Sequence, residues 1–203
     1  MTSGLAAGFL LDRQWHWLRG EMEESKRPTL LSLCQVLHDA RADYAIIGGL
    51  AVQIHHQEAR TTLAIDVAVI SRDAIPRDRL IAAGFRFHQT FAHSESWVGA
   101  DATPVQFTDA PMLANAIRQA GEIVVEDVPL RVIRVVDLLH EKLRAGSDPA
   151  RRRSKRLQDL GDAEALLEAS PDLERELRPE ERALLGDLLK GWTMTAEFHT
   201  API

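Results

Sequence analysis

The chain has 203 residues, of which 45% are hydrophobic and 27% charged, and its formal net charge is −6. This balance is typical of a globular protein, and the length suffices for one ordinary domain and a small helical appendage. No apolar run approaches the roughly 20 residues that cross a bilayer. The single cysteine, Cys34, excludes an intrachain disulfide and a multi-cysteine zinc site. We therefore expect a cytoplasmic protein with no membrane partner.

Basic residues are concentrated in one part of the sequence. Residues 142–156 contain seven Lys and Arg and one acid, Asp148, whereas residues 172–187 are rich in Asp and Glu. Local charge, more than net charge, determines where phosphate is attracted. For residues 151–153, contact with a nucleic acid or a triphosphate therefore competes with the ordinary interpretation, a solvated helix end.

The first half of the chain predicts alternating helices and strands. Apolar residues at helical spacing predict a helix over 30–40, after a packed or frayed N-terminal helix. Residues 44–47 predict a buried strand that ends at Gly48-Gly49, and residues 50–57 predict a helix. Residues 62–70 are β-branched and apolar apart from Asp66, which indicates a central strand.

The second half predicts further strands and then helices. We expect a short helix over 75–83, strands over 85–91 and 103–108, and a strand pair, 121–125 and 130–135, around a turn at 126–129. Helices follow over 137–144, 150–168 and 179–190. The fold class is therefore α/β (α+β), a small mixed sheet flanked by helices. The expected parts are a core over 1–135, a helical part over 136–191 that packs on it, and a tail over 192–203.

The segment 46–69 carries the candidate site. A strand that ends in Gly48-Gly49 and leads at once into a helix gathers backbone N–H groups, and a helix N-terminus favours an anion such as phosphate. Asp66 lies inside an apolar strand, where a carboxylate is costly unless a metal ion or a strong partner compensates it. Residues 64, 66 and 68 share one face of that strand. The alternative role for Asp66 is a turn cap or an ion pair with Arg60.

These residues resemble a known family. Gly48-Gly49-x-Ala51, followed by Arg60-x-Thr62 and Asp66, is similar to the signature of minimal nucleotidyltransferases in the DNA polymerase β-like superfamily. It looks most like the toxin branch of type IV toxin–antitoxin systems. Residues 135–145 and 153–160 are similar to the family's later helices, so the resemblance covers about 44–168. It implies a nucleotidyltransferase fold and Asp66 as the catalytic, Mg²⁺-binding residue. It assigns NTP binding to these residues: Gly48, Gly49, Arg60, Thr62, Lys142, Arg153, Lys155 and Asp159.

The sequence departs from this family at two carboxylates. The family has an aspartate at position 64 and another on a later strand, whereas this chain has Ala64 and, at the best match, Gln106. Asp101 and Asp109 are the nearest substitutes. Nucleotidyl transfer uses two Mg²⁺ ions about 3.5–4 Å apart, each in octahedral oxygen coordination. One carboxylate can hold a single Mg²⁺ that arrives with a nucleotide's phosphates, but it cannot hold the pair.

Three functions are compatible with this sequence. The first is an active enzyme that transfers a nucleotide to RNA, such as tRNA, to a protein or to a small molecule. The second is a pseudoenzyme that binds a nucleotide or RNA without turnover. The third is a protein-interaction module, such as the neutralising partner of an active toxin–antitoxin relative. The resemblance favours the first two, and whether the chain is an enzyme stays open. Two alternatives also remain for the helices: Lys142 can lie along the core, and Asp159 can pair with Lys155.

Overall fold

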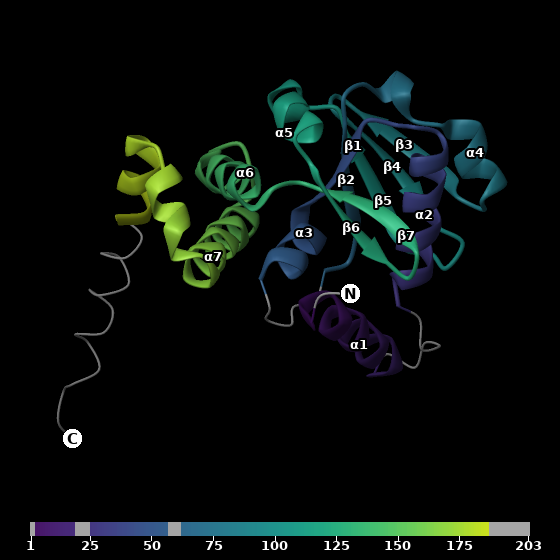
Figure 1. The fold of residues 1–203 in the computed structure, drawn as a ribbon, viewed down its shortest axis with the longest axis horizontal. Helices are drawn as coiled ribbons and strands as arrows, with labels where there is room; N and C mark the ends of the chain where they lie inside the picture. The colour runs from purple at the N-terminus through teal and green to yellow at the C-terminus, as the bar shows by residue number, and fades with distance from the viewer. Residues whose placement is uncertain (1–2, 19–24, 57–61, 187–203) are drawn as a thin grey trace. The chain divides into compact units, whose positions relative to one another are not determined.

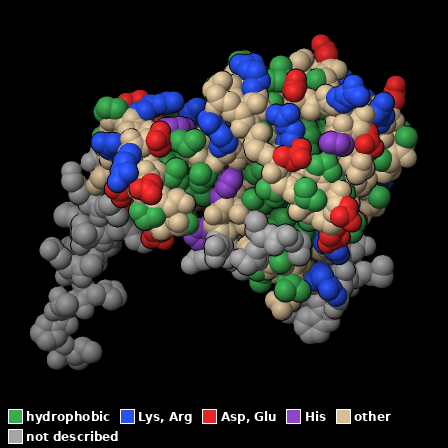
Figure 2. Space-filling view, in the orientation of Figure 1, with side chains coloured by type: hydrophobic (Ala, Val, Ile, Leu, Met, Phe, Trp, Pro, Cys, Tyr) green, Lys and Arg blue, Asp and Glu red, His purple; other side chains and the backbone are tan. Residues whose placement is uncertain are grey.

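The computed structural model describes residues 3–18, 25–56 and 62–186. The chain divides into two compact units, unit 1 over Met1–Leu138 and unit 2 over Leu139–Ile203. Figure 2 shows basic and acidic side chains interspersed on the visible face, with hydrophobic side chains between them. Within the described ranges, no helix has the length and apolar character needed to span a membrane.

Unit 1 is built on a seven-stranded mixed sheet of order β3-β4-β5-β2-β1-β7-β6 (Figure 1). Its strands are β1 (Tyr44–Ile47), β2 (Ile65–Val69), β3 (Arg86–Phe91), β4 (Ser94–Val98), β5 (Pro104–Thr108), β6 (Gly121–Val125) and β7 (Val128–Val132). In the centre, β2 pairs antiparallel with β1 and parallel with β5. The predicted fold class, a mixed sheet flanked by helices, is confirmed.

Helices connect and cover these strands. They are α1 (Ser3–Leu18), α2 (Arg27–Asp39), α3 (Gly48–His55), α4 (Arg77–Ala82) and α5 (Ala114–Arg118), with 3-10 turns at Arg72–Ala74 and Pro111–Leu113. α2 contacts β7, and its buried Cys34 contacts Tyr44 of β1. α5 contacts β1 and β2, and Arg131 of β7 donates from Nη2 to the Ile117 carbonyl of α5 at 2.9 Å. Ile46 of β1 pairs with Val132 of β7, so the side chains of Tyr44 and Arg131 point to opposite faces of the sheet. α2 packs on the face of Tyr44 and α5 on the face of Arg131, so the two helices cover opposite faces.

Two details of unit 1 differ from the sequence expectations. β4 was not expected from the sequence. It lies between β3 and β5, and its positions alternate between half-buried and buried. Its first three residues, Ser94, Glu95 and Ser96, are all polar, so the sequence does not show this alternation. The last hairpin is tighter than expected. Glu126 and Asp127 both have positive φ, 51° and 66°, so they form a two-residue turn and β7 begins at Val128.

Unit 2 is helical in the residues that the structure describes. α6 (Val135–Ser147) contains the unit boundary, and α7 (Arg153–Ala169), a 3-10 turn (Pro171–Glu176) and a helical stretch over 179–186 follow it. The buried side chains that hold these elements together are Leu139, Leu143, Leu160, Ala163, Leu166, Leu167, Leu173 and Leu177. The helical character of this part was expected. Its packing on the core stays a prediction.

Candidate functional site

The turn from β1 to α3 brings two glycines against the next strand. Gly48 has φ +64°, a conformation that side chains disfavour, and a Cβ placed on it would lie 2.9 Å from Cβ of Asp66. A Cβ on Gly49 would lie 2.8 Å from Cβ of Thr62. Such distances are too short for carbon atoms in contact. Glycine is therefore required at both positions for the turn to approach Asp66 and Thr62.

Asp66 and Gln106 are neighbours on one face of the sheet. Asp66 pairs with Ile47 of β1 on one side and with Gln106 of β5 on the other. Residues directly opposite each other in a sheet direct their side chains to the same face. Gln106 is exposed and donates from Nε2 to Oγ of Ser94 at 3.2 Å. The position expected for a further carboxylate therefore holds a neutral amide.

The two candidate substitutes have other partners. Oδ1 of Asp101 accepts a hydrogen bond from Oγ1 of Thr29 at 2.5 Å and another from the Thr103 N–H at 2.9 Å. Asp109 accepts from Nε of Arg72 at 2.8 Å, and it lies three residues beyond Gln106, about 10 Å along an extended chain. Among the described residues, no group of three or more His, Cys, Asp and Glu side chains is placed to hold a metal ion. One oxygen of each aspartate is thus engaged in a contact with another part of unit 1.

The remaining unit 1 residues of the prediction are Arg60 and Thr62. Arg60 lies outside the described residues. Thr62 lies against Gly49, and its hydroxyl is 3.5 Å from the Ala64 carbonyl oxygen. The structure thus brings together Gly48, Gly49, Thr62 and Asp66, and adds Gln106.

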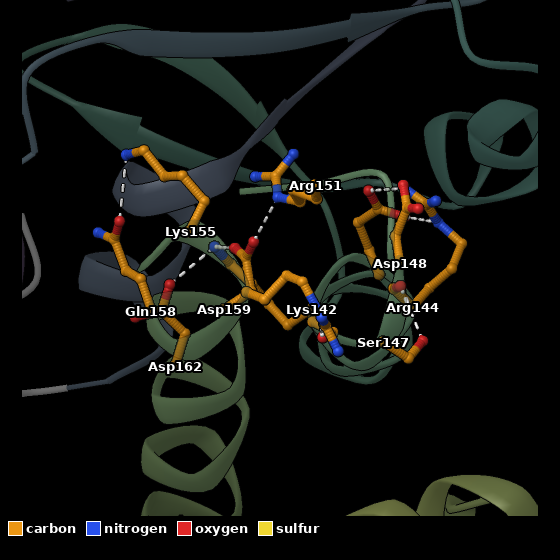
Figure 3. A network of polar contacts seen from close by, with 12 residues as sticks. Lys142, Arg144, Ser147, Asp148, Arg151, Lys155, Gln158, Asp159 and Asp162 are labelled. Carbon is orange, nitrogen blue, oxygen red and sulfur yellow. Dashed lines mark hydrogen bonds and ion pairs between the residues drawn. The ribbon is translucent and has the colours of Figure 1, made fainter. Parts of the chain in front are cut away.

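Lys142 belongs to an ionic cluster inside unit 2 (Figure 3). Its Nζ is 2.9 Å from Oδ1 of Asp159 and 2.7 Å from Oδ2 of Asp162, and Nε of Arg151 donates to the other oxygen of Asp159 at 2.8 Å. The Lys142 side chain is only 10% exposed, and the two aspartate side chains are 6% and 8% exposed. Two cations therefore meet two anions, and of the four only Arg151, whose side chain is 44% exposed, has substantial contact with water.

This cluster excludes one of the alternatives left open for α7. Asp159 does not pair with Lys155, whose Nζ instead donates to Oε1 of Gln158 at 3.1 Å. Asp162 was not singled out from the sequence. Its position three residues after Asp159, on the same side of a helix, was the available signal. Arg153 and Lys155 are exposed at the start of α7.

Cys34 and His55 are among the titratable groups of unit 1 whose pKa values are shifted. Burial raises the pKa of the Cys34 thiol to about 12, against a weaker effect of its hydrogen bond with Tyr44, so this cysteine is a buried packing residue. Burial lowers the pKa of His55, whose Nε2 is 2.7 Å from the Ile133 carbonyl oxygen. Neither group lies among the candidate site residues.

Solved structures share this architecture at low sequence identity. An antigenic nucleotidyltransferase-like protein from Paracoccidioides brasiliensis has a TM-score of 0.56 at 19% identity, covering 83% of this chain and 89% of that one. JHP933 from Helicobacter pylori has a TM-score of 0.53 at 15% identity, covering 81% and 72%. The antibiotic-resistance factor ANT(2'')-Ia has a TM-score of 0.51 at 13% identity, covering 84% and 94%. No family model matches the sequence, and no curated protein matches it significantly. The chain has the nucleotidyltransferase fold, as its sequence motifs predicted.

Proposed function

We propose that this protein binds a nucleoside triphosphate at the β1–α3 turn and does not catalyse two-metal nucleotidyl transfer. The observation that carries the proposal is the pairing of Asp66 with Gln106. Of positions 64, 66 and 106, only position 66 has a carboxylate, whereas the two-metal reaction requires several. The fold supports the binding half but does not establish it, because one fold hosts many functions.

The β1–α3 turn supports the binding half of the proposal. α3 starts at Gly48, directly after β1, so the first backbone N–H groups of the helix adjoin Asp66 and Thr62. The first N–H groups of a helix have no partner within it, and they suit a phosphate oxygen. The absence of side chains at Gly48 and Gly49 allows a ligand and the second strand to approach the same backbone.

The donor groups do not fit a two-Mg²⁺ centre. Ala64 offers no ligand, and the amide of Gln106 offers a neutral carbonyl oxygen that leaves the charge of a second ion uncompensated. Asp101 and Asp109 are held by Thr29 and Arg72. Under this proposal Asp66 is the one protein carboxylate for a single Mg²⁺ that enters with the triphosphate. Mg²⁺ commonly binds through one or two carboxylates together with substrate phosphates.

Calorimetry tests both halves of the proposal. Each of the four common NTPs is titrated into the native protein with Mg²⁺ and then with a chelator, and pyrophosphate release is measured in parallel. We expect saturable, Mg²⁺-enhanced binding of at least one NTP and no release of pyrophosphate. Asp66→Asn should weaken binding about tenfold, a change of about 1.4 kcal/mol. Asp78→Asn, at an exposed position of α4, is the matched control and should bind normally.

Two results would contradict the proposal in different ways. If no NTP binds the native protein, the nucleotide site is wrong. If the native protein releases pyrophosphate in a Mg²⁺-dependent reaction that Asp66→Asn abolishes, the protein is an active enzyme and the carboxylate assignment is wrong. A role as the neutralising partner in a toxin–antitoxin pair stays a prediction of the sequence resemblance.

A further inference from the structure

The start of α7 carries a row of basic residues on the surface of unit 2. Residues 151–156, called the basic turn below, comprise the end of the α6–α7 connection and the first turn of α7. Arg152, Arg153 and Lys155 are exposed, and the Arg151 side chain is 44% exposed. Arg156 is partly buried, with its Nε donating to the Gly146 carbonyl at 2.9 Å.

The acids nearest the basic turn already have partners. Asp159 and Asp162 contact Lys142 and Arg151 in the buried cluster (Figure 3), and Glu141 pairs with Arg144. Among the described residues, no acidic side chain pairs with Arg152, Arg153 or Lys155. Within the basic turn, Arg151 is paired with Asp159, whereas the charges of Arg152, Arg153 and Lys155 are not offset by a described acid.

The position of the basic turn increases its positive potential. α7 has Arg152 as its N-cap, with no side-chain hydrogen bond to the helix, and has no acid in its first turn. A helix N-terminus carries partial positive charge, so cations there are unfavourable by roughly 0.3–1 kcal/mol each. The unfavourable interaction is relieved when an anion binds. A sequence that breaks such a local rule without internal compensation marks a candidate functional site.

We infer that the basic turn binds the phosphodiester backbone of an RNA strand. Its cations follow one another along the chain and lie on the surface, which suits a row of phosphates. Residues 139–186 contain no Phe, Tyr or Trp, so no aromatic side chain of this stretch stacks on a base, and the basic residues suit backbone phosphates. Exposed Ser154 and Gln158 lie among the cations and offer hydrogen bonds to the ribose 2′-hydroxyl, which DNA lacks. This inference extends the proposed function and assigns Arg153 and Lys155 to RNA in place of the nucleotide.

Fluorescence anisotropy with a labelled single-stranded RNA of mixed sequence tests this inference on the full chain. The salt concentration is varied, and a DNA strand of the same sequence is measured beside it. The variant R153E/K155E replaces two cations by acids that favour a helix N-terminus, so α7 is retained. The control R175E/R178E makes the same change in net charge at two exposed arginines of unit 2, with side chains 84% and 62% exposed.

The native protein should bind RNA more tightly than DNA, with an affinity that falls steeply with salt. R153E/K155E should lose at least about tenfold in affinity, and its slope of log K against log salt should become shallower by about 1.4, since each contact with a single strand contributes about 0.7. The RNA affinity of the control should stay within about twofold of that of the native protein.

Four results would each overturn the inference: unchanged RNA binding by R153E/K155E, an equal loss of affinity in the control, equal affinity of the native protein for DNA, or no RNA binding at low salt. NTP calorimetry on the native protein separates this outcome from a failure of the nucleotide site, because RNA binding and NTP binding are measured in independent titrations.

Discussion

Asp66 of β2 and Gln106 of β5 are direct partners in a parallel pair, and their side chains lie on the same face of the sheet. Ser94 of β4 accepts the amide hydrogen bond of Gln106. This relationship places a neutral group beside the aspartate of the motif. Under the proposed function, this neutral group limits how much positive charge a ligand-bound metal can bring to Asp66.

Restoring the expected carboxylates should create a divalent-metal centre. The double variant A64D/Q106D should bind Mn²⁺ at least about tenfold more tightly than the native protein, because two added carboxylates compensate the charge of the ions. Electron paramagnetic resonance of free Mn²⁺ measures this affinity. The variant should also melt at a lower temperature without metal, since like charges are brought together, and should regain stability on addition of Mg²⁺.

The neutral variant A64S/Q106N serves as the control for these changes. Its side chains alter the same positions without adding charge, so its Mn²⁺ affinity should match that of the native protein. If A64D/Q106D also matches the native protein, positions 64 and 106 do not face a common metal site with Asp66.

The sequence was sufficient for the parts of the site that depend on local chemistry. The β1–α3 turn follows from an apolar strand that ends at Gly48-Gly49, and the face of Asp66 follows from the alternation of a strand. The pairing with Gln106 was expected only from the family resemblance, since strand order depends on long-range contacts. β4 was missed because its polar residues have a weak preference for strands. Its pairing with β3 and β5 stabilises it as a strand, and this long-range pairing is not visible in the local sequence.

The ionic cluster of unit 2 was less predictable. Helical spacing places Asp159 and Asp162 on one side of α7, but spacing within a helix does not identify the partner on another helix. The connection between α6 and α7 determines that Lys142 and Arg151 reach these aspartates. Lys142 was therefore assigned by resemblance to a phosphate, whereas the structure places its ammonium between two carboxylates (Figure 3).

Replacing Gly48 by alanine should destabilise unit 1. The left-handed conformation costs a residue with a Cβ about 1–2 kcal/mol, and the new methyl group would also displace the Asp66 carboxylate. We expect a loss of at least about 2 kcal/mol in the free energy of unfolding, measured by urea titration.

Gly161→Ala is the comparison, because no atom lies within 4 Å of a Cβ at this helical position. It should stabilise the protein by about 0.5–1 kcal/mol. Similar effects from both changes would show that Gly48 has no special role.

Removing the buried ammonium of Lys142 should strongly destabilise unit 2. In Lys142→Met the apolar volume is nearly kept, but Asp162 loses this cation and Asp159 keeps only Arg151. Breaking a buried ion pair on one side costs about 3–5 kcal/mol. Far-UV circular dichroism during urea unfolding measures the loss. The triple variant K142M/D159N/D162N removes the buried negative charges as well and should recover much of the stability. If the triple variant is no more stable than Lys142→Met, the cost does not arise from uncompensated charge.

The shifted pKa of His55 predicts how unit 1 responds to acid. Burial lowers this pKa in the folded protein, against the smaller opposing effect of the hydrogen bond with the Ile133 carbonyl. The unfolded chain, with a His pKa of about 6.5, therefore binds the proton more readily. The contribution of His55 to stability is complete above about pH 6.5 and is lost as the pH falls toward the folded-state pKa.

His55→Gln keeps an N–H donor for Ile133 without titrating, so its unfolding free energy should fall less between pH 7.5 and 5.5 than that of the native protein. His88→Gln, at an exposed position of β3, should retain the native pH dependence. An NMR titration of the His55 ring checks the premise directly, and a folded-state pKa at or above about 6.5 would contradict it.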